Sequence, residues 1–206
     1  VWKLQDVFKS EAVDLPPSSL IEMARFSIPS FLMITMVAIM CNIDIILARH
    51  YCPPDQAGYY ATATILGRIA FFLPSSLLIV LFPSVAKATV SGSKDNHYLW
   101  VSFSLTFILS GGVFLVFFIA SHSIIQLFYG EQYYSAAPIL VIVAAAMGLL
   151  AMSHVIFSYN MARSEFGFLW PLFVGMTLML SLVFFYHDSP ETIAWVLLIS
   201  IATIFF

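Results

Sequence analysis

Two charged residues lie inside strongly apolar segments of the chain, and they are the first candidates for a functional site. Asp44 falls near the end of one apolar run, and Arg68 lies roughly ten residues, or about 15 Å of helix, into the next. An unpaired charge at that depth costs at least ~2.5–3.5 kcal/mol, so such side chains usually face a bundle interior or a water-filled cavity. Arg68 is therefore not expected to face lipid.

Three interpretations of Asp44 and Arg68 follow from the residues alone. In the first, the two side chains form a buried salt bridge that locks a helical hairpin. In the second, they form a charged wall of a translocation cavity, which does not exclude pairing in one conformational state. In the third, Asp44 alone extends to the outer membrane interface. The sequence does not decide among them.

A polar stripe accompanies Arg68. Spacings of four, four and seven residues place Tyr60, Thr64, Arg68 and Ser75 on one face of a helix. We predict that these residues and Asp44 line a substrate cavity. Asp44 is also a candidate for proton or ion coupling, and so is His154, which shares a helix face with Ser158. A lone intramembrane histidine can equally be an interhelical hydrogen-bond donor.

Three prolines are predicted to bend the apolar helices that contain them. Each removes one backbone hydrogen bond and crowds the preceding turn. Bent helices beside charged groups are common at transporter binding sites. The three predicted kinks are at Pro29, Pro74 and Pro171.

No catalytic constellation is evident. The sequence contains no HExxH, GxSxG or glycine-rich phosphate loop. The histidines near the predicted outer face, His50, His122 and His187, come from three separate loops, which argues against a metal site. We therefore expect no enzyme activity, no cofactor and no metal.

The composition indicates an integral membrane protein. Hydrophobic residues make up 61% of the chain, charged residues only 9%, and the mean hydropathy is +0.97. Soluble globular domains lie far from these values. The net charge of −3 gives no basis for binding nucleic acid, so nucleic acid is not an expected partner.

Six apolar runs predict an all-α bundle of six transmembrane helices. A bilayer core of ~30 Å needs about 20 apolar residues of helix. The predicted spans, the last of which looks cut short, are 26–48, 59–82, 98–120, 137–158, 166–186 and 190–206. Apolar residues at helical spacing ahead of them predict an amphipathic cytoplasmic connector over 1–18, with a disordered connector as the alternative, and the bundle over 19–206.

The basic residues predict the orientation of this bundle. Arg49 lies on one side, and six of the eight lysines and arginines lie on the other: Lys3, Lys9, Arg25, Lys87, Lys94 and Arg163. The positive-inside rule then places the N-terminus in the cytoplasm and the bundle in the inner or plasma membrane. The outer loops are expected near 49–57, 121–136 and 187–189, and all of them are short.

One hairpin resembles that of polysaccharide exporters and oligosaccharide-lipid flippases, within the multidrug/oligosaccharidyl-lipid/polysaccharide exporter superfamily. The elements that carry the resemblance are Asn42 with Asp44, Ala57-Gly58-Tyr59, Gly67-Arg68, Pro74 and Leu81-Phe82-Pro83. Downstream, LFYGEQYYSAAPIL is similar to the short outer segment of the family, with Gly130 and Tyr133. The similarity covers about 26–165, and it depends on order and spacing together rather than on one strict motif.

The resemblance implies a transporter of two six-helix bundles, of which this chain would be the second. Such a protein flips or exports lipid-linked oligosaccharides, such as O-antigen precursors of lipopolysaccharide, by alternating access. The expected partners are a polyprenyl-pyrophosphate-linked oligosaccharide, membrane lipid and the N-terminal half of the same transporter. Arg68 would contact the anion, and Asp44 would be its partner or a cation site.

Two other functions remain open from the sequence. The first is a multidrug or cation-coupled exporter of the same superfamily, in which an acidic residue would dominate substrate contact. The second is a membrane enzyme of polysaccharide assembly, a polymerase or ligase, which would be expected to carry a large external loop. The sequence does not name the sugar, and we interpret the chain as a fragment of a longer protein.

Overall fold

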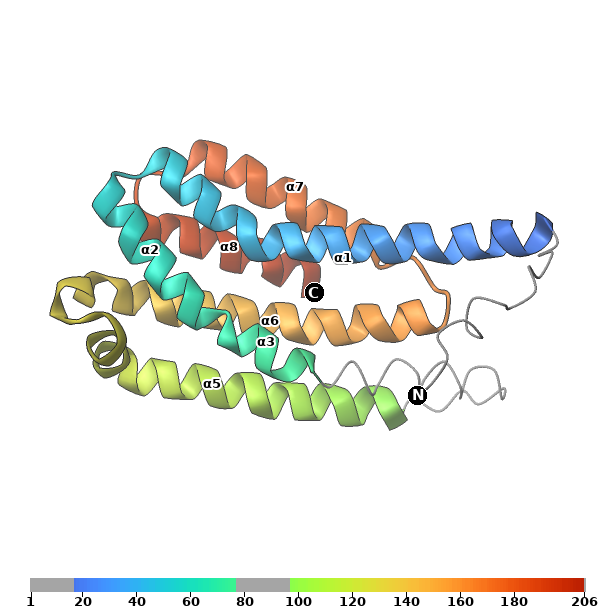
Figure 1. Cartoon of the computed structure of the whole chain (residues 1–206), viewed down its shortest axis with the longest axis horizontal. Coiled ribbons are helices and arrows are strands. Elements are labelled where there is room, and N and C mark those ends of the chain that lie inside the picture. The colour runs from blue at the N-terminus through green and yellow to red at the C-terminus, as the bar shows by residue number, and fades with distance from the viewer. Residues whose placement is uncertain (1–16, 77–96, 206) are drawn as a thin grey trace, which may run out of the picture.

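The computed structural model describes residues 17–76 and 97–205, and every regular element in these residues is helical (Figure 1). The predicted all-α class is confirmed. The predicted connector over 1–18 lies outside the described residues except for its last two, which open the first helix. The elements are α1 (Pro17–Tyr51), α2 (Pro54–Gly67), α3 (Ile69–Ser75), α5 (His97–Tyr129), the 3-10 helix η2 (Glu131–Ala136), α6 (Ala137–Ala162), α7 (Leu169–Phe185) and α8 (Pro190–Phe205).

Three stretches of helix are long and apolar enough to cross a membrane. They are Arg25–Tyr51, Leu99–Tyr129 and Glu131–Ala162. Helices α7 and α8 are apolar but shorter, with 17 and 16 residues. The predicted span 59–82 is described only as far as residue 76, and it is divided at Arg68 into α2 and α3. Within residues 17–76 and 97–205, three of the six predicted spans therefore have membrane-crossing length.

Two of the predicted outer loops are mostly helical, which corrects the sequence-based expectation. Helix α1 continues to Tyr51 and α2 begins at Pro54, so little of 49–57 is loop. Helix α5 continues to Tyr129 after a kink at Ala120 (φ −120°, ψ 19°), where the predicted span ended. A helix satisfies its own backbone hydrogen bonds, so it can extend beyond the apolar run that predicts it.

The α1–α2 connection, η2 and the α7–α8 connection gather at one end of the bundle, at the left of Figure 1. We call this the distal end. Contacts between rings join these segments: Tyr51 stacks on His187 at 4.3 Å between centroids, and Tyr59 meets Tyr133 edge-to-face at 5.8 Å. The predicted outer segments thus share one end, as alternating spans require.

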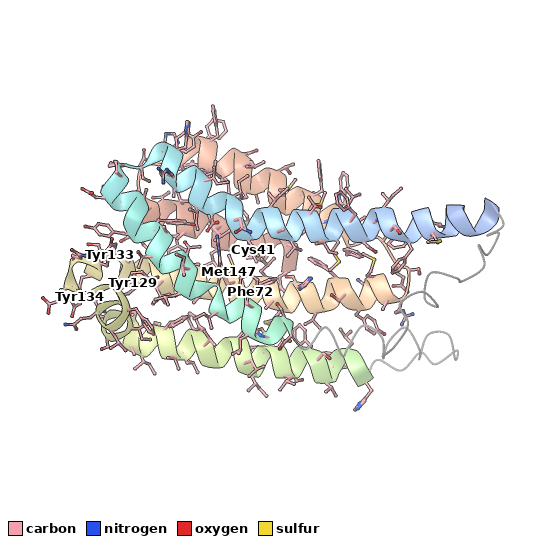
Figure 2. All side chains as sticks on the ribbon, in the orientation of Figure 1. Cys41, Phe72, Tyr129, Tyr133, Tyr134 and Met147 are labelled. Atoms are coloured by element: carbon pink, nitrogen blue, oxygen red, sulfur yellow. The ribbon has the colours of Figure 1, made fainter. Side chains whose placement is uncertain are left out.

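Helix α6 is the centre of the bundle, and α2, α3, α5 and α8 all pack against it. Its Met147 is fully buried and belongs to the same core as Cys41 of α1 (Figure 2). Helix α5 differs, because large apolar side chains such as Ile119 and Phe118 are 81% and 63% exposed. In a membrane protein, an exposed apolar face of this kind is solvated by lipid.

The prolines occupy three different settings. Pro29 lies inside α1, which continues through it. Pro74 lies inside α3, but the interruption of the helix occurs earlier, at Arg68. Pro171 lies in the first turn of α7, where its missing N–H would have no helical partner, so the predicted kink there is wrong.

Ser110 of α5 compensates for the hydrogen bond that Pro74 removes. Pro74 cannot donate to the carbonyl of Ala70 four residues earlier, and Ser110 Oγ donates to that oxygen instead at 2.9 Å. This bond joins α5 to the helix that follows Arg68. Ser110, which directly precedes Gly111 and Gly112, therefore has a specific partner on a neighbouring helix.

Replacing Ser110 with alanine should destabilise the bundle by about 1 kcal/mol, because the Ala70 carbonyl loses its donor. Thermal unfolding in detergent would measure the loss. Ser104→Ala, at an exposed position of the same helix, is the matched control and should have little effect. Combined with Pro74→Ala, which restores a helical N–H, Ser110→Ala should cost less. An equal cost in both backgrounds would contradict the pairing.

Candidate functional site

Asp44, Arg68 and Tyr60 form one hydrogen-bonded cluster between α1 and α2. Arg68 Nη2 lies 3.2 Å from Asp44 Oδ1, and the Tyr60 hydroxyl donates to Asp44 Oδ2 at 3.1 Å. The Asp44 side chain is completely buried, and Tyr60 is buried beside it. A buried carboxylate needs such partners, because its desolvation would otherwise cost several kcal/mol. The salt bridge predicted as one of three alternatives is therefore present.

Asn42 is a fourth member that was not predicted as a site residue. Arg68 Nη1 donates to Asn42 Oδ1 at 3.2 Å, while Asn42 Nδ2 donates to the Ala38 carbonyl at 2.7 Å. The guanidinium therefore spans two residues of α1, one exposed and one buried. Asn42 stood out in the sequence only beside Asp44 in the family resemblance, because residues two apart on a helix do not share a face.

Arg68 also faces outward. Its side chain is 14% exposed, and its Nε is buried without a hydrogen-bond partner in the described part of the chain. Around it lies an open groove of about 510 Å³, lined by Arg68 with Ile65, Ile69, Phe72 and Leu73. These four apolar side chains are 42–60% exposed, and Figure 2 labels Phe72 on this surface. Within the described residues, the cluster thus ends at an exposed apolar face that includes the Arg68 guanidinium.

The local backbone fixes the position of Arg68. It is the residue between α2 and α3, with φ −65° and ψ −16°, and its N–H donates to the Thr64 carbonyl at 3.0 Å. Just before it, Gly67 lies so close to α6 that an added Cβ would be 2.7 Å from Val143 Cγ1. The close approach of α2 to α6 therefore fixes the backbone position from which the Arg68 side chain extends toward the surface of the bundle.

The other two members of the predicted stripe bond to the backbone of their own helices. Thr64 is buried beside Tyr60, and its hydroxyl donates to the Tyr60 carbonyl at 2.8 Å. Ser75 donates in the same way to the Phe71 carbonyl at 2.6 Å. Thr64 therefore lies in α2 next to the cluster, whereas Ser75 lies in α3, beyond the interruption at Arg68.

His154 is separate from the charged cluster. Its ring packs against Phe71 of α3 at 5.6 Å between centroids, and its Nδ1 is buried without a hydrogen-bond partner among the described residues. The interhelical hydrogen bond considered for this histidine is absent at Nδ1. A role in proton coupling stays a prediction.

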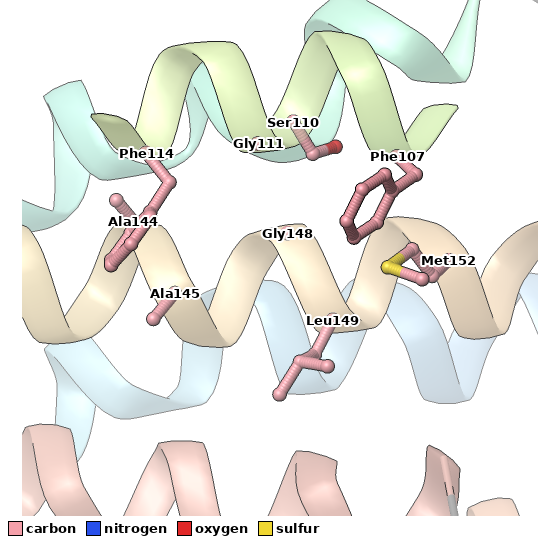
Figure 3. A pocket seen from close by; sticks show the side chains of 9 residues that line it. All are labelled: Phe107, Ser110, Gly111, Phe114, Ala144, Ala145, Gly148, Leu149 and Met152. Carbon is pink, nitrogen blue, oxygen red and sulfur yellow. The ribbon is translucent and has the colours of Figure 1, made fainter. Parts of the chain in front are cut away.

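A second hollow, between α5 and α6, has a different character (Figure 3). Its volume is about 210 Å³, and Gly111 and Gly148 face each other at its middle between bulkier side chains. Ser110 is the only residue with a side-chain hydroxyl in its lining, and that hydroxyl is bonded to the Ala70 carbonyl. The hollow therefore offers no free polar group to a charged or sugar-like ligand.

Comparison with protein families identifies the chain. Residues 12–138 match the family model described as polysaccharide biosynthesis protein. The chain belongs to this family. The matched residues include the whole cluster of Asn42, Asp44, Tyr60 and Arg68, as well as the groove around Arg68. Neither curated proteins nor solved structures gave a match to the chain.

Membership of the polysaccharide biosynthesis family agrees with the resemblance to polysaccharide exporters found in the sequence. Together with its long apolar helices, it makes the chain a membrane protein involved in polysaccharide biosynthesis. Within such a protein, the clearest candidate for a ligand-binding residue is Arg68, which lies at an apolar groove.

Proposed function

We propose that the protein moves a lipid-linked oligosaccharide across the cell membrane by alternating access, without covalent chemistry. The observation that carries this proposal is the position of Arg68, which is anchored on a buried aspartate yet opens onto an unpartnered apolar face. A purely structural ion pair would gain nothing from such exposure. A phosphate-bearing lipid offers both an anion for Arg68 and a hydrocarbon chain for the face around it.

Arginine suits this role because its guanidinium carries five N–H donors in a planar fork. Asp44 and Asn42 each accept from one terminal nitrogen, and Nε has no partner in the described residues. Nε is buried, so pyrophosphate oxygens would be bound through charge-assisted hydrogen bonds by the terminal nitrogens, each of which carries a second N–H. Asp44 holds the arginine in place when no substrate is bound, and a competing anion weakens that pairing.

The exposed face of Ile65, Ile69, Phe72 and Leu73 is the proposed wall of the transport cavity. In the proposed transporter, the N-terminal half of the same protein closes the opposite side. The N-terminus lies in the cytoplasm, as the basic residues indicate, and the distal end lies outside. Membrane lipid solvates the outer apolar surface, including that of α5.

A flipping assay tests this function. The full-length protein is reconstituted in proteoliposomes with a fluorescent polyprenyl-pyrophosphate oligosaccharide, and a membrane-impermeant glycosidase reports which leaflet holds the sugar. We expect the protected fraction to become accessible only in vesicles that contain the protein. Unchanged protection would overturn the proposal. Formation of a longer glycan would favour a polymerase or ligase, and efflux of an unmodified cationic dye instead would favour a multidrug exporter.

A further inference from the structure

A further pocket, distinct from the groove at Arg68 and from the hollow between α5 and α6, lies at the distal end of the bundle. It has a volume of about 250 Å³ and combines the first turns of α2 with η2. Its lining is polar and aromatic, unlike the other two cavities: Pro54, Asp55, Gly58, Tyr59, Gln132 and Tyr133. Ligand pockets for drug-sized molecules are somewhat larger, so this volume suits one or two small rings.

Two tyrosine rings line this pocket, and a third packs on one of them. Tyr59 and Tyr133 are perpendicular, with centroids 5.8 Å apart, and the Tyr129 ring contacts Tyr133 at 5.8 Å between centroids. Figure 2 shows Tyr129, Tyr133 and Tyr134 grouped at this end. Gly130 makes the geometry possible, because its φ of +87° turns the chain from α5 into η2. The rings are therefore held by the backbone and by each other.

The polar groups of the pocket are free to bind a ligand. Within the described residues, the hydroxyls of Tyr59 and Tyr133 and the amide of Gln132 make no hydrogen bond, and Asp55 makes no ion pair. No lysine or arginine lines the pocket. The carboxylate of Asp55 therefore disfavours an anionic ligand and favours one that donates hydrogen bonds.

A sugar ring has the matching chemistry. One face of a pyranose presents C–H groups that pack on an aromatic ring, while its hydroxyl groups donate to a carboxylate and accept from an amide. Pyrophosphate does not fit beside Asp55. Tyrosines also gather at membrane interfaces as an aromatic belt. Here, however, Tyr59 and Tyr133 are half-buried and turned toward each other around polar groups, rather than pointing separately into lipid.

We propose that this distal pocket is a glycan-binding site, which holds an uncharged sugar unit of the oligosaccharide. That the sugar is the transported glycan rests on the proposed function, whereas binding itself does not. In this arrangement Arg68 contacts the pyrophosphate, and the distal pocket receives the sugar at the outer end. Asp55, Gln132 and the tyrosine pair determine which sugar units fit.

The test is saturation-transfer difference NMR on the full-length protein in phosphatidylcholine nanodiscs. The probes are the oligosaccharide released by mild acid from the cells' own lipid-linked fraction, and neutral and uronic-acid disaccharides. We expect the released oligosaccharide and neutral disaccharides to bind. Tyr133→Leu and Asp55→Asn should each raise Kd about tenfold, as for loss of one good contact. Tyr134→Leu, an adjacent tyrosine outside the pocket, should leave Kd unchanged.

Several results would contradict sugar binding by the distal pocket. These are no transfer to any sugar, binding confined to uronic-acid probes, or an equal loss in Tyr134→Leu, which would indicate an aromatic belt. Tyr133→Phe keeps the ring and removes only a hydroxyl. This variant should stay folded and retain most binding, which would assign the effect of Tyr133→Leu to loss of the ring. Glycerol and phosphatidylglycerol headgroups serve as competing probes, and their binding in place of sugars would assign the pocket to lipid.

The flipping assay separates this site from the proposed function. If the protein binds sugar but does not flip the lipid-linked oligosaccharide, the proposed transport fails and the glycan site stands. If it flips the substrate without binding sugar, the distal site fails and transport stands. Asp44→Asn with Arg68→Gln, which removes both charges of the buried pair, should stop flipping while leaving sugar binding intact, because neither residue lines the pocket.

Discussion

Replacing Arg68 with alanine should abolish export and lower the free energy of unfolding by about 3–5 kcal/mol, as when one partner of a buried ion pair is removed. Asp44 has no exposed surface and would keep only Tyr60 as a side-chain partner. Cell-surface polysaccharide and membrane abundance would be measured together. Arg68→Lys keeps the charge but loses the planar fork, so we expect weaker export with better abundance.

A double variant separates anion binding from stability. Asp44→Asn with Arg68→Gln removes both charges and keeps hydrogen-bonding side chains, so abundance should recover. Export should not recover, because no cation remains beside the groove of Ile65 and Phe72. If export returns with abundance, Arg68 acts only as a structural lock of the hairpin, and the proposed contact with pyrophosphate is wrong.

The pairing of Asp44 and Arg68 was one of three alternatives that the sequence left open, and the reason is physical. Charges are so costly within an apolar run that few arrangements are open to Asp44 and Arg68, and pairing is one of them. Tyr60 was also placed correctly on the helix face, because it lies eight residues before Arg68. Asn42 was missed as a site residue because its contact with Arg68 depends on the width of the guanidinium rather than on helical periodicity.

Element boundaries were harder to predict than the site. Hydropathy marks where a membrane span is needed, but a helix continues for as long as its backbone permits. Residues after Ala120 therefore remain helical as far as Tyr129. The break at Arg68 directly follows Gly67 and was not predicted, whereas the kink predicted in this span was at Pro74, six residues later. Tertiary contacts decide such features, and a single sequence does not contain them.

In the proposed transport cycle, the pairing would also let one arginine serve two conformational states. A fully exposed arginine on an apolar face would bind any anion, whereas one held by Asp44 and Asn42 releases its donors only to a ligand that competes with a carboxylate. A pyrophosphate, with several charged oxygens, is such a ligand. The cluster therefore favours multiply charged anions over single carboxylates.

Gly67→Ala should destabilise the bundle by about 1–3 kcal/mol and reduce export, because it overpacks the contact between α2 and α6. The new Cβ would lie 2.7 Å from Val143 Cγ1 and 3.3 Å from the Ala144 backbone nitrogen. The side chain of Val143 belongs to a closely packed core, so α2 must move away. Arg68 follows immediately, and its contact of 3.2 Å with Asp44 would be displaced.

Second-site rescue tests this interpretation. Val143→Ala removes Cγ1, the atom nearest to the new Cβ, while Val143 Cβ remains at 3.2 Å, so Gly67→Ala with Val143→Ala should be more stable than Gly67→Ala alone and should regain part of the export. Gly112→Ala, where an added Cβ meets nothing within 4 Å, is the matched control and should not destabilise. Thermal unfolding and surface polysaccharide would both be measured. If Val143→Ala gives no rescue, steric contact with α6 does not position Arg68, and Gly67 acts through helix flexibility instead.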